Sequence, residues 1–166
     1  MVTDYIRARD ELHRRLARIF EPELFATLYP QAEKSPKVFL GFPVTEPPYY
    51  CAVDEIIDNL DTAGSATMGH AEVSFTLHVW LSAQHADLEK ASNTLLCYID
   101  AVAGAVLADQ RLNMSVDNSF AGIEASGTAA DSSKRYIAAA SMAVECTVYS
   151  QCPAALLQAV ADANEG

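Results

Sequence analysis

The segment from Glu72 to Leu107 constrains the fold most, because its hydrophobic pattern changes period once along its length. Apolar and polar residues first alternate, with one apolar set at Val73, Phe75, Leu77, Val79 and Leu81. This alternation is typical of a strand with one buried face. Apolar residues then recur every three or four positions, at Leu88, Ala91, Leu95, Ile99, Val102 and Val106. Such spacing predicts one face of a long α-helix, and a helix packed on a sheet predicts an α+β domain.

The residues before this segment predict shorter elements separated by prolines. We expect a first helix from an N-cap at Thr3 to about Phe20. A short helical turn at 24–28 and an edge strand at 38–40 should follow, since proline is tolerated at sheet edges. A further strand is predicted at 49–57.

The residues after the long strand and helix predict two more strands and a tail. We expect strands at 116–126 and 136–149, with mobile loops at 58–69 and 127–134, where glycine, serine and other small residues gather. This order of elements predicts a mixed or antiparallel sheet, with the long helix on one face. Residues 1–150 are expected to form one domain.

Residues 151–166 are expected to form a C-terminal tail, which Pro153 opens as a short helix to about Ala163. No stretch approaches the roughly 18 uncharged apolar residues that a membrane span needs. The N-terminus carries acidic residues among its arginines, which is untypical of a signal peptide. The sequence therefore predicts neither membrane insertion nor secretion.

The net charge of −11 is unevenly distributed along the chain. The first twenty residues hold five arginines and three carboxylates, a net of +2, which leaves −13 for the rest. An acidic body argues against a nucleic-acid-binding surface, because phosphate contacts need clustered lysine and arginine. An acidic surface is compatible with a protein wall past which DNA moves without binding.

No cofactor or metal site is predicted from the residue types that would hold one. Four cysteines, Cys51, Cys97, Cys146 and Cys152, form no CxxC pair, so free buried thiols are favoured over zinc or disulfides. Glycine-rich phosphate loops are absent from the sequence.

An acidic run contains Asp54, Glu55, Asp58 and Asp61 but lacks the DxDxDG pattern of a calcium loop. A solvated strand end is the favoured interpretation, because carboxylates are mostly exposed. The alternative is a contact for a basic surface. The first helix of a neighbouring copy could supply it, since its arginines form the one dense positive patch in the sequence.

The four histidines, at positions 13, 70, 78 and 85, show no metal-ligand spacing. His78 lies on the polar side of the long strand, where a surface or interface role is expected. His70 beside the first loop could serve a nucleophile, yet no GxSxG motif is present. We predict no enzyme. The alternative is a small enzyme or ligand-binding domain with His70 or His78 as acid–base group in a pocket between helix and sheet.

Two further features are candidates for contacts rather than chemistry. Trp80 should point away from the long helix, either beneath another element such as the first helix or into a subunit interface, where tryptophan is enriched. The pair Lys134–Arg135 opens the last strand, where charges commonly keep a strand edge soluble.

Three stretches in order carry a family resemblance: "SFTLHVWL", then "LEKASNTLLCYIDAVAGAVLAD", then "RYIAAASMAVECTVYS". With the N-terminal helix and the proline-rich passage before them, this layout resembles the tail terminator and tail completion proteins at the neck of long-tailed bacteriophages. The resemblance covers about residues 1–150 and rests on element order rather than on a diagnostic motif.

The resemblance implies a hexameric ring that caps the tail tube, binds the tail tube protein and the head-completion (connector) protein, and lets DNA pass without specific binding. It implies a place in the virion tail or neck after assembly in the host cytoplasm, and no cofactor. Another head–tail adaptor or a baseplate component remains an alternative. The interface candidates are Arg7, Arg14, Arg18, Asp54, Glu55, Asp58, Asp61, Trp80, Lys134 and Arg135.

Overall fold

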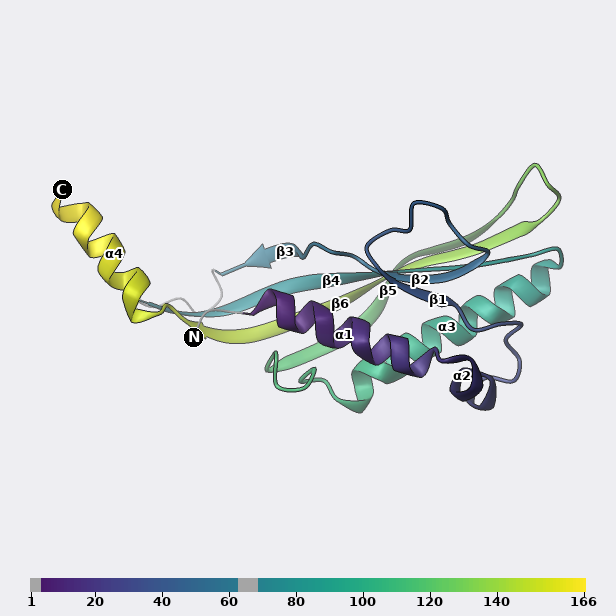
Figure 1. Cartoon of the computed structure of the whole chain (residues 1–166), viewed down its shortest axis with the longest axis horizontal. Helices are drawn as coiled ribbons and strands as arrows, with labels where there is room; N and C mark the ends of the chain where they lie inside the picture. The colour runs from purple at the N-terminus through teal and green to yellow at the C-terminus, as the bar shows by residue number, and fades with distance from the viewer. Residues whose placement is uncertain (1–3, 63–68) are drawn as a thin grey trace.

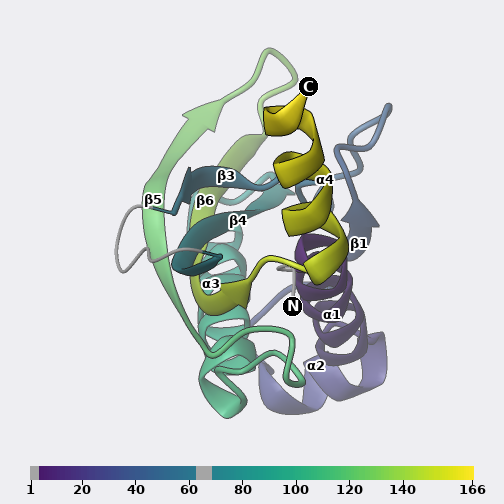
Figure 2. The same cartoon turned by 90° about the vertical axis from the view of Figure 1, so that its left-hand side faces the viewer.

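The computed structural model describes residues 4–62 and 69–166, and there the chain forms a mixed sheet with helices on one face (Figures 1 and 2). The predicted α+β class is confirmed. The elements in order are α1 (Tyr5–Ile19), α2 (Pro22–Leu28), β1 (Lys37–Leu40), β2 (Tyr49–Val53), β3 (Asp58–Asp61), β4 (His70–His85), α3 (Leu88–Ala108), β5 (Asn118–Ala130), β6 (Tyr136–Gln151) and α4 (Ala154–Glu165).

Two long antiparallel strands, β4 and β6, form the centre of the sheet. They pair over their full length, from His70 opposite Gln151 to His85 opposite Tyr136. On the other edge of β4 lie β2 and, further along, β3, while β1 pairs with β2 in parallel. β5 pairs with the free edge of β6, so the order is β1-β2-β4-β6-β5 with β3 beside β4.

The hydrophobic core fills the space between the sheet and the helices α1 and α3. The alternating apolar residues of β4 are buried, as the period of two predicts. Ala8, Leu12 and Leu16 recur at helical spacing on α1 and are fully buried above them. Each large apolar side chain buried in this way stabilises the fold by about 1.5–3 kcal/mol.

The first turn of helix α1 is stabilised by an N-terminal cap. Helix α1 is capped by Asp4, whose Oδ1 accepts a hydrogen bond from the Arg7 N–H at 2.9 Å. The predicted cap, Thr3, lies outside the described residues.

Helix α3 is long and apolar enough to cross a membrane by length and composition, but its apolar stripe packs against the sheet, as in a core helix.

The structure corrects three predicted boundaries. Strand β2 ends at Val53 rather than near residue 57, because the Asp54 carboxylate accepts from the Ile56 N–H and turns the chain. The loop predicted at 58–69 contains strand β3, and residues 63–68 of that loop lie outside the described residues. The first half of the loop predicted at 127–134 is strand, since β5 continues to Ala130.

Tyr98 of α3 joins the core to the proline-rich segment. Its side chain is fully buried, and its ring lies 5.6 Å from the rings of both Phe20 and Phe25. The hydroxyl donates a hydrogen bond to the Lys34 carbonyl at 2.5 Å. Burial raises the pKa of the Tyr98 phenol, so it remains a donor. One side chain therefore packs the core and satisfies a backbone carbonyl.

We expect Tyr98→Phe to lower the free energy of unfolding by about 1–3 kcal/mol, because the Lys34 carbonyl loses its donor. Tyr98→Ala should cost about 3–5 kcal/mol, since it also leaves a cavity. Tyr29→Phe is the matched control, because the Tyr29 hydroxyl bonds Asp100 at the exposed surface and its loss should be nearly neutral. Urea denaturation measures all three. Equal losses for the two phenylalanine variants would contradict the role given to Tyr98.

Candidate functional site

No helix of the described chain covers the face of the sheet opposite α1 and α3 (Figure 2). Outward side chains of β4 alternate with the buried ones, so this outer face carries its own set of residues. One half of the outer face is an apolar trough and the other half holds a polar cluster. These two regions are the candidate functional site.

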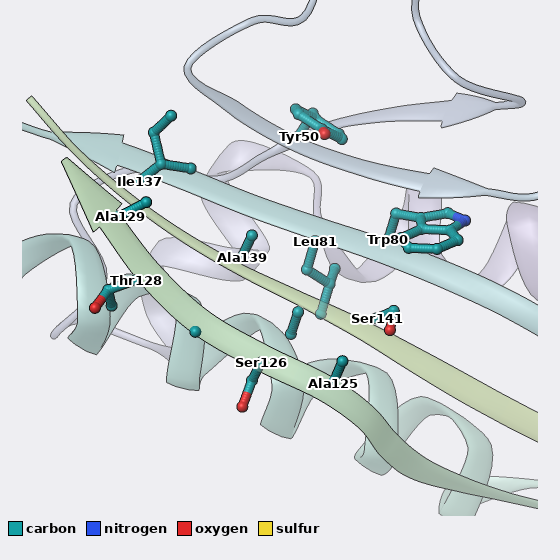
Figure 3. A pocket seen from close by; sticks show the side chains of 12 residues that line it. Tyr50, Trp80, Leu81, Ala125, Ser126, Thr128, Ala129, Ile137, Ala139 and Ser141 are labelled. Carbon is teal, nitrogen blue, oxygen red and sulfur yellow. The ribbon is translucent and has the colours of Figure 1, made fainter. Parts of the chain in front are cut away.

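Small side chains form the floor of the trough. Two rows of paired residues cross four strands here, Ala52–Trp80–Ser141–Ala125 and Tyr50–Ser82–Ala139–Gly127. The rings of Trp80 and Tyr50 stand on the β4 and β2 side, and β5 bounds the opposite side (Figure 3). The cavity between them has a volume of about 430 Å³. A shallow apolar trough with aromatic walls is suited to receiving a protein element.

A β-bulge in β5 shapes both regions of the outer face. The register of β5 against β6 shifts between Ile123 and Ala125. Ile123 lies opposite Met142, while Ala125 lies opposite Ser141, the next residue of β6. The bulge thereby turns the following residues into the trough and aims Glu124 across the sheet, as bulges commonly re-aim a side chain.

Trp80 is covered by the loop after β1 and not by the first helix. Its ring centroid lies 5.2 Å from that of Phe42. Gly41, with φ +80°, turns the chain just before Phe42. Another element of the same chain thus covers one side of Trp80, but the suggestion that this element is the first helix is wrong, because α1 packs on the opposite face. Trp80 keeps partial exposure beside the trough, so its interface role stays a prediction.

The polar cluster brings His78 between two carboxylates from different strands. His78 Nδ1 lies 2.5 Å from Glu124 Oε1 on β5, and its Nε2 lies 3.3 Å from Asp58 Oδ2 on β3. Its neighbour on β6 is Ala143, whose small side chain leaves space for Glu124 to reach across. Each nitrogen of the imidazole therefore faces a carboxylate from a different strand.

The structure corrects two expectations about the histidines. His78 is only 9% exposed, so a surface role is wrong, while an interface role stays a prediction. His78 also points away from α3, so a pocket between helix and sheet does not contain it. His70 is eight positions away along β4 and stacks on Tyr149 with ring centroids 6.0 Å apart. The two histidines therefore do not converge on one site.

The arginines of α1 already have acceptors within the chain. Arg7 donates to the Asn113 carbonyl at 2.8 Å. Arg14 pairs with Glu11 and Arg18 with Glu21, and both arginine side chains are 65% exposed. Exposed ion pairs contribute about 0–1 kcal/mol, so Arg14 and Arg18 can exchange these partners for another chain.

Arg15 has a structural role that its sequence context does not reveal. Its side chain is 15% exposed and donates to the carbonyls of Ala105 and Asp109 and to the Asp109 carboxylate. Backbone hydrogen bonds from Asn113, together with others from Arg111 and Arg15, hold the pKa of Asp109 below its usual value. Arg15 thus fastens α1 to the C-terminal end of α3.

The predicted acidic set is dispersed rather than gathered into one patch. Asp54 holds its own turn, and Asp58 contacts His78. The backbone carbonyl of Glu55 accepts from Arg9 at 3.0 Å, so α1 touches this run within the same chain. Asp61 lies exposed on β3.

The basic pair lies in the turn between β5 and β6, at the end of the trough. Lys134 is exposed with φ +63°, and Arg135 donates to the Gln84 carbonyl at 3.2 Å. Asp131 stabilises this turn by accepting from the N–H groups of Ser133 and Arg135.

The thiols and carboxylates show no arrangement for metal or redox chemistry in residues 4–62 and 69–166. There, no group of three His, Cys, Asp or Glu residues is placed to bind a metal ion. All four cysteines are free; Cys51 and Cys146 are buried, and the other two are partly exposed. Burial raises the pKa of Cys146 to about 12, which makes it a poor nucleophile.

A comparison with protein-family models found no match, and neither did a comparison with curated proteins.

We expect Arg14→Glu with Arg18→Glu to weaken self-association about tenfold or more, because two exposed charges are reversed on one helix face. The control is Lys34→Glu with Lys90→Glu, which changes the net charge equally on exposed residues outside α1. Sedimentation velocity measures the oligomer, and circular dichroism checks the fold. An unchanged oligomer in the α1 variant would exclude α1 from the contact.

Proposed function

We propose that this chain is a structural protein of a phage tail or neck, which assembles as a ring, caps the tail tube and joins it to the head-completion proteins. The observation that carries the proposal is the apolar trough across the helix-free face of the sheet. Trp80 and small residues lie there at a surface that the described chain leaves open. Exposed apolar surface of this kind marks interaction sites.

The free edge of β5 supports an assembly role beside the trough. β5 is the last strand of the sheet, so the thirteen residues Asn118–Ala130 have one unpaired edge among the described strands. Phe120 and Ile123 on it are about half exposed. A long strand edge with apolar side chains is a template for pairing with another chain unless it is covered.

Charge and element order support the more specific part of the proposal. The order α1, β4, α3, β5 and β6 is the order on which the resemblance to tail terminator proteins rests. The net charge of −11 suits a ring whose channel conducts DNA without holding it, because like charges repel. A ring needs two different complementary patches on each copy, and this chain has several distinct exposed surfaces.

A self-association measurement tests this function first. We expect native mass spectrometry to give a closed assembly of six copies and negative-stain images to show a ring with a central hole. Added to a polymerising tail tube protein, the ring should stop elongation and sit at tube ends. A protein that remains monomeric at high concentration would overturn the proposal. A ring that leaves tube length unchanged would keep the assembly role and exclude the terminator role.

The second candidate function is a small-ligand or acid–base site at the polar cluster. It is favoured by the convergence of His78 with Asp58 and Glu124. A hollow of about 360 Å³ lies further along the same strands and is lined by other residues, Asn59 and Phe120 among them. The hollow also reaches Thr76 and Glu145, which add polar groups to its wall.

A thermal-shift screen with nucleotides, sugars, amino acids and carboxylic acids separates the two functions. The structural role predicts that none of these compounds raises the melting temperature of the parent protein. A compound that stabilises the parent and the His70→Ala control but not His78→Ala would favour the second function instead.

A further inference from the structure

Helix α4 has an apolar face that the described chain leaves largely exposed, with Leu157 alone lying close to Gly69. None of its residues is buried, and Leu156, Leu157 and Val160 are 49%, 45% and 53% exposed. These three residues share one face, while Gln158, Asp162 and Glu165 lie on the other. Isolated helices shorter than about 12–15 residues are marginal in water. A helix of this length therefore gains its stability by docking.

The trough cannot receive the α4 helix of its own chain. α4 projects beyond one end of the sheet, and the β5–β6 turn lies at the other end (Figure 1). From Ser141 in the trough to Gln151 at the end of β6 an extended strand covers about 33 Å. The two-residue link to α4 spans about 7 Å and the helix about 18 Å, so folding back falls short.

We propose that α4 of one copy docks in the trough of a second copy. The trough is lined by Ser141, Ala139 and Gly127, and small residues allow a helix to approach the sheet closely. The side chains of Leu156 and Val160 provide the apolar ridge that such a trough accepts, with Trp80 beside it.

The charges at the two partners are complementary. α4 contains Asp162 and Glu165 and no basic residue. The turn at the end of the trough presents Lys134 and Arg135, and the Lys134 side chain is exposed. Opposite charges at the rim of a contact steer the orientation and speed the encounter more than they add affinity.

Exchange of α4 rests on the proposed self-assembly and specifies the contact that produces it. Each copy donates a helix at one end and receives one at the other, so the contact joins two different surfaces. Such heterologous contacts close into a ring when the rotation permits and otherwise propagate as a filament.

Two full-length variants remove the two halves of the contact separately. Leu156→Asp with Val160→Asp disables the helix, and Ala139→Arg fills the trough from an exposed position. Each alone should be monomeric under conditions where the parent assembles, with the far-ultraviolet spectrum of a folded chain. The controls are Ala155→Asp with Gln158→Asp on the opposite face of α4, and Ser132→Arg in the exposed β5–β6 turn. Both controls should assemble like the parent.

Mixing the two variants gives the decisive measurement. The helix-defective chain still has a trough and the trough-defective chain still has a helix, so the mixture should form a 1:1 pair and nothing larger. Trp80 is the sole tryptophan of the chain and borders the trough, so its emission reports occupancy directly. A peptide of residues 152–166 should shift that emission saturably in the helix-defective chain. A peptide carrying the two aspartates should not.

The outcomes separate this inference from the proposed function. A parent that assembles while the helix-defective variant assembles equally would overturn the α4 contact and leave the structural role standing. A mixture without 1:1 pairs, or emission that the peptide leaves unchanged, would also overturn it. A monomeric parent would overturn both.

Discussion

The antiparallel pairing of β4 with β6 is the constraint on which the rest of the structure depends. Sixteen residues of each strand pair without interruption. Side chains alternate between the two faces of a strand. The pairing therefore places the inward apolar side chains of β4 and β6 beneath α1 and α3, and it presents the residues between them on the outer face. The helices cover only the first face. The same pairing that builds the core therefore also builds the open outer face.

The outer face owes its shape to residues that are poor strand formers. Alanine, glycine and serine dominate the second half of β5 and the paired part of β6, and in β5 their low strand propensity favours a loop when the segment is taken alone. Pairing of β5 with β6 overrides that preference. The small side chains then leave a trough where larger ones would have filled the face. A feature that weakens the local strand signal thus produces the surface that a partner can use.

The environments of the charged side chains likewise depend on the tertiary arrangement and not on the local sequence pattern. The five arginines of α1 look equivalent in the sequence, yet Arg15 is partly buried at the end of α3 while Arg14 and Arg18 remain exposed. Similarly, Asp58 and Glu124 are far apart in the chain and meet at His78. The polar cluster could not be predicted, because it requires the β3 pairing and the β5 bulge at once. Neither has a periodic signal.

The sequence by itself determined the α+β class, the long strand β4, the helix α3 and the inward face of β6. Each follows from a repeated hydrophobic period over many residues, which is a local property. Only the tertiary structure decided that β3 pairs with β4, that β5 extends to Ala130, that His78 is buried and that the trough is open. These features depend on non-local pairing and on which face the helices cover. No short stretch of residues encodes such relations.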